Sequence, residues 1–187
     1  RDLTNATNAK QVQCVYSGVN VTGFNNTLAF SNNAAEARTL KQSGTLPEAF
    51  TIACWVRLDV LDQATHIIVD VGGGGVVGMY FSGSTTDAFR GLVYVGGNQE
   101  VFGIKTKTDV SKWYHVAITY DGSSVLKLYV DGELEASKAA GNVTISQAAI
   151  EWLGFDGVTT ASLNGDAQDL VILDVEAPLA TIRKLMR

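Results

Sequence analysis

Hydrophobic and polar residues alternate at every second position along most of this chain, which is the pattern of strands half buried in a sheet. The clearest example starts at Phe50, where Ile52, Cys54, Val56 and Leu58 follow on the same face. The segments predicted as strands are 28–30, 37–40, 50–58, 66–71, 76–81, 89–95, 100–104, 113–120, 125–130, 150–153 and 168–173. Turn residues separate them, so a fold built of short strands is expected.

The segment 113–120 differs from the others because neither of its faces is strongly polar. This predicts a central strand that is covered on both sides. Turn dipeptides follow at Asp121-Gly122 and Asp131-Gly132. Because no helices lie between the strands, the pattern predicts an all-β antiparallel sandwich or barrel rather than a parallel α/β sheet. The one helix expected is 179–186, which carries an apolar stripe.

Composition narrows the class of protein. The chain has 187 residues, enough for one core and too few for two ordinary domains. Hydrophobic residues make up 46% and charged residues 18%, which excludes a disordered chain. The net charge of −5 argues against nucleic-acid binding, and no apolar run approaches the roughly 20 residues of a membrane helix. Residues 1–27 are polar and are expected to form an arm or an edge strand before a compact domain of residues 28–187.

The cysteines allow two interpretations. Cys14 and Cys54 belong to no metal-binding spacing, so a zinc site is not expected. Cys54 lies in an apolar strand and fits a small buried hydrophobic residue. It also fits a disulfide to Cys14 in an oxidising compartment, where the bridge would tie down the N-terminal segment.

Glycosylation acceptor patterns favour a secreted or surface location. The pattern Asn-X-Thr begins at Asn5, Asn20, Asn25 and Asn142. Sequences rich in threonine also produce such matches by chance. The chain begins at Arg1 without a methionine, so either a leader was removed or the sequence is a segment of a longer protein.

Four segments resemble the laminin-G-like domains of the concanavalin-A-like lectin group, of which pentraxins are the nearest relatives. The segments are WYHVAITYDG (113–122), LYVDG (128–132), FTIACWV (50–56) and NGDAQDLVIL (164–173), the last followed by Pro178, Leu179 and Ile182. The resemblance spans about residues 28–186. It implies a jelly-roll of two packed antiparallel sheets with a short C-terminal helical turn. It also implies extracellular recognition or adhesion more often than catalysis, although a fold does not define a function.

The resemblance also implies a candidate site for calcium. Related jelly-rolls hold one structural calcium ion with an aspartate on the last strand, the position of Asp169, and Asp166 lies near it. The alternative is that Asp169 caps a turn or pairs with a lysine. The acidic cluster that gives pentraxins two calcium ions is not matched, because 70–75 and 154–157 supply one carboxylate each.

The acids Asp131, Glu133 and Glu135 raise the question of catalysis. Glycosidases of the related fold place three acids on one strand face, and one acts as nucleophile and another as acid. Here the order differs and Asp131 belongs to a turn, so the acids are interpreted as exposed. His115 is interpreted as packed and hydrogen bonded, and His66 has no partner at metal-ligand spacing. The chain is therefore not expected to be an enzyme.

A ligand site is expected where loop residues can accept and donate hydrogen bonds beside an exposed ring. The glycine run 72–75 is interpreted as a rim loop, which could let a ligand approach the backbone. The rim segments 83–90 and 96–100 supply Asp87, Arg90, Asn98 and Gln99 as candidate ligand-binding residues.

We expect a non-catalytic extracellular recognition or adhesion module that binds a glycan or a protein surface within a multivalent assembly. The main alternative is a structural domain of an extracellular filament or virion surface with no small ligand. In that alternative, residues 1–27 cross to a neighbouring copy as an added strand. A glycoside hydrolase is a third and weaker alternative.

Overall fold

The structure is a computed structural model of the chain. It describes residues 2–4, 28–30, 39–43, 46–61, 65–71, 77–82, 88–94, 98–103, 108–110, 112–141, 149–152, 163 and 165–187. The side chains of 2–4, 28–30, 39–43, 98 and 149–152 lie outside that description.

The strands are β1 (Asp2–Thr4), β2 (Leu28–Phe30), β3 (Thr39–Ser43), β4 (Ala49–Leu58), β5 (Thr65–Val71), β6 (Val77–Ser82), β7 (Ala88–Tyr94), β8 (Asn98–Phe102), β9 (Trp113–Asp121), β10 (Val125–Val130), β11 (Glu133–Ala139), β12 (Ala149–Trp152) and β13 (Gly165–Leu173). The helix α1 spans Leu179–Lys184. The predicted helix is thus confirmed, with a turn in place of its last two residues.

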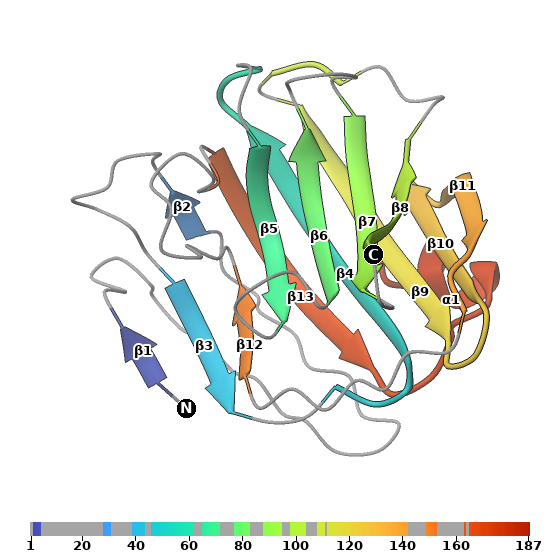
Figure 1. Cartoon of the computed structure of the whole chain (residues 1–187). Helices are drawn as coiled ribbons and strands as arrows, with labels where there is room; N and C mark the ends of the chain where they lie inside the picture. The colour runs from blue at the N-terminus through green and yellow to red at the C-terminus, as the bar shows by residue number, and fades with distance from the viewer. Residues whose placement is uncertain are drawn as a thin grey trace.

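The strands form two antiparallel sheets packed face to face (Figure 1). The seven-stranded sheet has the order β1-β3-β12-β5-β6-β7-β8, and the six-stranded sheet has the order β11-β10-β9-β4-β13-β2. Strands distant in sequence are neighbours, as β4 with β13, which is typical of a jelly-roll. The predicted all-β jelly-roll sandwich is confirmed, and β9 is an interior strand as its two apolar faces indicated.

The strand β11 was not expected from the sequence. Its residues include Ala136, Ser137, Lys138 and Ala139, which have low strand propensity. The tight turn at Asp131 and Gly132, where both φ angles are positive (49° and 72°), directs the chain back along β10. Pairing with β10 therefore creates a strand that local propensity does not predict.

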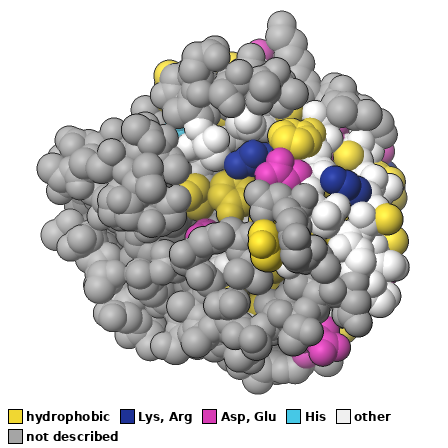
Figure 2. All heavy atoms as spheres, viewed as in Figure 1, with side chains coloured by type: hydrophobic (Ala, Val, Ile, Leu, Met, Phe, Trp, Pro, Cys, Tyr) yellow, Lys and Arg dark blue, Asp and Glu magenta, His cyan; other side chains and the backbone are white. Residues whose placement is uncertain are grey.

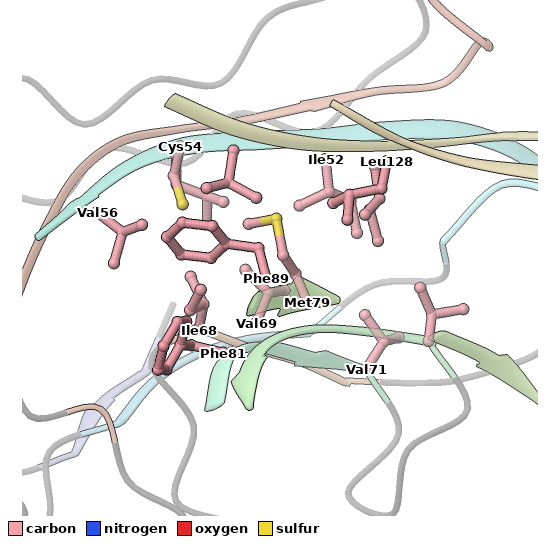
Figure 3. Close-up of a cluster of buried hydrophobic side chains, with 14 of the residues drawn as sticks. Ile52, Cys54, Val56, Ile68, Val69, Val71, Met79, Phe81, Phe89 and Leu128 are labelled. Atoms are coloured by element: carbon pink, nitrogen blue, oxygen red, sulfur yellow. The ribbon is translucent and has the colours of Figure 1, made fainter. Parts of the chain in front are cut away.

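The core lies between the two sheets (Figure 3). Ile52, Cys54 and Val56 of β4 point toward Met79 and Phe89 of the opposite sheet and interlock with them (Figure 3). Close packing of these apolar side chains removes them from water and provides the main stabilisation of the sandwich.

Cys54 belongs to this core. It is fully buried, and burial, with a smaller contribution from the charge of Asp169, raises the pKa of its thiol. Cys14 lies outside the described residues, so the bridge between the two cysteines stays a prediction. The same is true of the glycosylation acceptors Asn5, Asn20 and Asn25.

The remaining acceptor, Asn142, and the glycine run 72–75 also lie outside the described residues.

The N-terminal strand β1 pairs with β3 of the same chain at the edge of the seven-stranded sheet. The division of the chain at residue 27 into an arm and a domain stays a prediction.

The helix α1 covers part of the outer face of the six-stranded sheet. Ile182 packs with Ala53, Ala117, Tyr129 and Val171 in a second apolar cluster. Three polar contacts hold the segment around the helix in place: Thr51 Oγ1 with the backbone of Val175 and Ala177 (both 2.8 Å), Lys127 Nζ with Glu176 Oε1 (2.5 Å), and Arg183 Nε with the carbonyl of Gly132 (3.0 Å). The part of the outer face around Ala53, Ala117 and Val171 is thereby buried.

Asp121 organises the turn between β9 and β10. Its Oδ1 accepts hydrogen bonds from the backbone N–H groups of Ser123, Ser124 and Val125, at 2.9, 2.7 and 3.0 Å. Slight burial raises the pKa of the Asp121 carboxyl, but these hydrogen bonds lower it by more, so it lies well below its usual range.

Replacing Asp121 with alanine is expected to destabilise the protein by about 1–2 kcal/mol, because three backbone donors lose their acceptor and must turn to water. Urea unfolding at pH 7 measures this loss. Asp121→Asn, which keeps an oxygen acceptor, is the control and should lose less. Equal losses in the two variants would show that the charge, rather than the acceptor, matters.

Candidate functional site

The outer face of the seven-stranded sheet carries a connected group of polar and aromatic side chains. Strand register brings Asp70, Gly78, Leu92 and Glu100 into one row across β5, β6, β7 and β8. A second row contains Ile67, Tyr80, Arg90 and Phe102. We call Asp70, Tyr80, Arg90 and Glu100 the Arg90 group. All four lie on the side of the sheet away from the core. Arg90 and Glu100 are partly exposed and can meet a ligand there, whereas Asp70 and Tyr80 are buried.

Tyr80 lies flat along its own strand. A Cβ atom at Gly78 would approach the Tyr80 ring to 2.1 Å, so only glycine leaves room for the ring there. The Tyr80 hydroxyl is 3.2 Å from Oδ1 of Asp70, which is buried. Ile67 and Leu92 pack with the ring. The ring therefore forms a fixed floor for this part of the face.

Arg90 lies above that floor. Its guanidinium carbon is 4.9 Å from the centre of the Tyr80 ring, a cation–π contact. Among the described residues it pairs with the carboxylate of Glu100, with Nη1 to Oε2 at 3.6 Å, and the two side chains are 20% and 23% exposed. At this distance the two groups form an ion pair, but they are too far apart for a hydrogen bond. The Nε of Arg90 is buried and has no acceptor among the residues that the structure describes.

The view in Figure 2 looks onto this sheet. A basic side chain lies directly beside an acidic one among hydrophobic side chains, in a window of described atoms over β6 to β8 (Figure 2). Tyr94, at the end of β7, is 48% exposed and lies on the same side of its strand as Arg90. The face thus combines an exposed ring with charged hydrogen-bonding groups.

The four residues predicted to bind a ligand do not all lie together on one rim of the sandwich. Arg90 lies in the middle of β7 rather than on a rim. Asn98 begins β8 and pairs with Tyr94, and Asp87 lies outside the described residues. Gln99 pairs with Val93, whose side chain is in the core, so it alternates to the other side of β8 from Glu100.

Sequence reasoning did not select Asp70, Tyr80, Glu100 or Tyr94 as site residues. They come from four strands, and their meeting depends on register. One signal was available: in 77–82, Gly78 and Tyr80 are two positions apart, so a glycine and a large ring share one face.

The acids considered for catalysis do not act together. Asp131 Oδ1 accepts a hydrogen bond from the backbone N–H of His115 (2.9 Å), and Glu133 is exposed and pairs with Arg183 (2.6 Å). Glu135 is only 3% exposed, so its interpretation as exposed is wrong. The reason is the irregularity in the pairing of β10 with β11, which inserts Glu135 as an extra residue and turns it inward.

Asp70 and Glu100 are also unsuitable as a glycosidase pair. They lie on β5 and β8, with two strands between them. Three strand spacings of about 4.8 Å separate them by about 14 Å, whereas glycosidase pairs lie about 5–9.5 Å apart. This geometry gives no support to the hydrolase alternative.

The histidines are packed residues. His66 is buried against Phe81, with ring centres 5.9 Å apart. His115 is 2% exposed and meets the edge of Trp55 at 5.3 Å. Burial lowers the pKa of His115 to about 4. The expectation that its ring is hydrogen bonded is wrong for Nδ1, which is buried and has no partner in the described part of the chain.

The candidate calcium ligands lie on β13. Asp166 forms a salt bridge with Arg57, and Asp169 is at an irregularity of the strand with a positive φ of 54°. Burial raises the pKa of the Asp169 carboxyl, which a bound cation would offset. Within the described ranges, no three histidine, cysteine or acidic side chains are grouped to hold a metal ion. A calcium ion here would rely on backbone carbonyls and stays a prediction.

Three solved structures share this fold. The heptameric SAP-like pentraxin from Limulus polyphemus aligns over 92% of this chain and 84% of its own, with 14% identity and a TM-score of 0.68. The binding domain of botulinum neurotoxin serotype G aligns over 90% of this chain and 46% of its own, with 16% identity and a TM-score of 0.66. Trypanosoma rangeli sialidase aligns over 73% of this chain and 22% of its own, with 18% identity and a TM-score of 0.55.

This chain thus spans less than half of the neurotoxin domain and under a quarter of the sialidase. At these identities the likeness shows the fold alone. No curated protein matches the chain in sequence. In the described part of the chain, no helix is long and apolar enough to cross a membrane.

A family model gives the assignment. Residues 30–183, most of the chain, match the laminin G family described as "Concanavalin A-like lectin/glucanases superfamily". This agrees with the observed jelly-roll and with the segments that carried the resemblance in sequence. The chain therefore belongs to the concanavalin A-like lectin/glucanases superfamily.

Proposed function

We propose that this chain is a non-catalytic extracellular recognition module that binds a glycan through the Arg90 group on the outer face of the seven-stranded sheet. The observation that carries the proposal is Arg90 itself. Its side chain is only 20% exposed and lies on the Tyr80 ring, yet among the described residues its Nε has no acceptor and its charge is paired only at 3.6 Å. Buried donors without acceptors are costly, so a ligand that offers oxygen acceptors is favoured.

Tyr94 supports a glycan as the ligand. Sugars stack their C–H faces on aromatic rings and hydrogen bond to charged side chains at the edges. Tyr94 is exposed four residues beyond Arg90, which is about 13 Å along a strand. That length suits an oligosaccharide better than a single sugar.

The fold relatives support binding as the general role. One of them is a botulinum neurotoxin receptor binding domain, and another is a heptameric pentraxin. By analogy we propose that this chain works in a multivalent assembly at a cell or virion surface or in the extracellular space. Copy number would then raise the affinity of shallow sites.

A glycan array with the purified chain, with and without calcium, tests the proposal. Tyr94→Ala is expected to reduce binding of a positive glycan at least tenfold, because the exposed ring is lost. Val175→Ala, which also truncates an exposed apolar residue (43%), should bind as the original chain does. Arg90→Gln should also bind weakly. Absence of any glycan signal, or equal binding by Tyr94→Ala, would refute the proposal.

The structural alternative makes a different prediction. If residues 1–27 join neighbouring copies, their removal should dissociate an assembly in sedimentation. Residues 2–4 pair with β3 of their own chain, which favours no change. Dissociation on truncation, together with a negative array, would favour the structural domain.

A further inference from the structure

Among the described residues, the helix α1 packs on only part of the outer face of the six-stranded sheet. Its apolar cluster reaches Ala53 of β4 and Ala117 of β9. Beyond them, the strand register continues with a row of His115, Trp55 and Gln168. The next row contains Trp113, Arg57 and Asp166. We call Trp55, Arg57, Trp113, His115 and Gln168 the tryptophan face. It lies on the opposite side of the sandwich from the Arg90 group.

Two indole rings dominate this face. Trp55 and Trp113 come from adjacent strands in diagonal positions, which are about 7–8 Å apart. Both are half-buried, so each has a fixed side and a side open to solvent. Arg57 supports Trp113 from 5.9 Å, and His115 supports Trp55 from 5.3 Å. Rings held in this way lose little freedom when a flat ligand stacks on them.

His115 supplies the second observation. It is only 2% exposed and lies in the same row as Trp55. Its Nδ1 has no hydrogen-bond partner among the residues described by the structure. Native proteins satisfy nearly all buried polar groups, so an unpaired nitrogen beside a half-buried ring indicates a place where a polar group from outside is accepted.

The charges select the kind of ligand. Two described cations lie at this face and both are paired with carboxylates: Arg57 bonds Asp166 and lies 3.4 Å from Asp59, and Lys112, at the border beside Trp113, lies 4.0 Å from Asp131. Because these three described carboxylates outnumber the two cations that they pair with, this part of the face disfavours phosphates, sulfates and acidic sugars. Carboxylates and an amide accept hydrogen bonds from hydroxyl groups. A neutral polyhydroxyl compound with apolar C–H faces fits both features.

We propose that the tryptophan face is a second, independent binding site, and that its ligand is a neutral oligosaccharide. The two indoles stack on the C–H faces of successive sugar rings. Gln168 and the carboxylates at the border bind their hydroxyl groups. A module with sites on both sides of its sandwich links two glycan chains, which raises avidity without any change within either site.

Titration of the full ¹⁵N-labelled chain with neutral hexasaccharides tests this proposal. The probes are gluco-, xylo- and manno-configured hexaoses, and the readout is the position of the tryptophan indole N–H signals. At least one hexaose is expected to shift the signals of Trp55 and Trp113 in a saturable manner. Trp113→Ala should weaken that binding at least tenfold, and Trp113→Phe should weaken it less. Tyr94→Ala, on the opposite face, is the matched control and should leave it unchanged.

The outcomes separate the two sites. Binding that Tyr94→Ala abolishes and Trp113→Ala preserves supports the Arg90 group and refutes the tryptophan face. Unshifted indole signals with every hexaose also refute it. A Trp113→Ala variant that dissociates an oligomer in sedimentation would show that a second copy of the chain occupies the face, which equally overturns the proposal.

Discussion

Replacing Phe89 with alanine is expected to lower the free energy of unfolding by about 3–5 kcal/mol, the usual cost of removing a buried phenyl ring. Phe89 is 1% exposed and joins the two sheets. Its ring centre lies 5.5 Å from that of Phe81 in its own sheet and 5.5 Å from that of Tyr114 in the other. The variant therefore loses apolar burial, two ring contacts and the filling of the space between the sheets.

Urea unfolding followed by circular dichroism and tryptophan fluorescence measures this loss. Tyr94→Ala is the matched control, because it truncates an exposed ring on the same strand. Its expected loss is about 0.5 kcal/mol or less. If Phe89→Ala were no more destabilising than this control, Phe89 could not be at the centre of the core.

The second large effect is a dependence of stability on the protonation of His115. Burial lowers its pKa to about 4 in the folded state from an ordinary value of 6.5. As the pH falls below 6.5, the unfolded chain therefore binds a proton before the folded chain does. The contribution of the neutral His115 is complete above pH 6.5, decreases between pH 6.5 and 4, and is absent below that. The total is about 3 kcal/mol.

Unfolding curves at intervals between pH 7.5 and 4 measure this effect, in the original chain and in His115→Gln. The variant cannot gain this proton, so its stability should fall about 3 kcal/mol less over the same interval. All other titrating groups are common to both proteins and cancel in the difference. Parallel curves for the two proteins would show that His115 is not held neutral by burial.

Periodicity in sequence was sufficient for strands that bury one face. The alternation from Phe50 to Leu58 predicted β4, and the two apolar faces of 113–120 predicted a central strand. Both depend on local spacing, because a strand places successive side chains on opposite sides whatever its neighbours are. The turn at Asp131 and Gly132 was equally local, since its positive φ angles favour these residue types.

Strand β11 and the orientation of Glu135 were not predictable in this way. β11 has one extra residue in its pairing with β10, so the side chains beyond that point face the opposite side of the sheet from the one that simple alternation predicts. As a result Glu135 is buried while its apolar neighbour Leu134 is 38% exposed, the reverse of what their polarity suggests. Such an exchange depends on the partner strand, which the residues 133–139 do not encode by themselves.

The amino-acid sequence by itself determined the class of this protein: strand periodicity, turn dipeptides and four family-like segments specify a jelly-roll of the lectin superfamily. Only the tertiary structure decided which side chains meet. Arg90 reaches Tyr80 and Glu100 through the pairing of β7 with β6 and β8, the strands before and after it, and Trp55 meets His115 through the pairing of β4 with β9, which is far away in the chain. Register and irregularities of pairing set those neighbours, and they arise from contacts across the whole sheet rather than from local residue preferences.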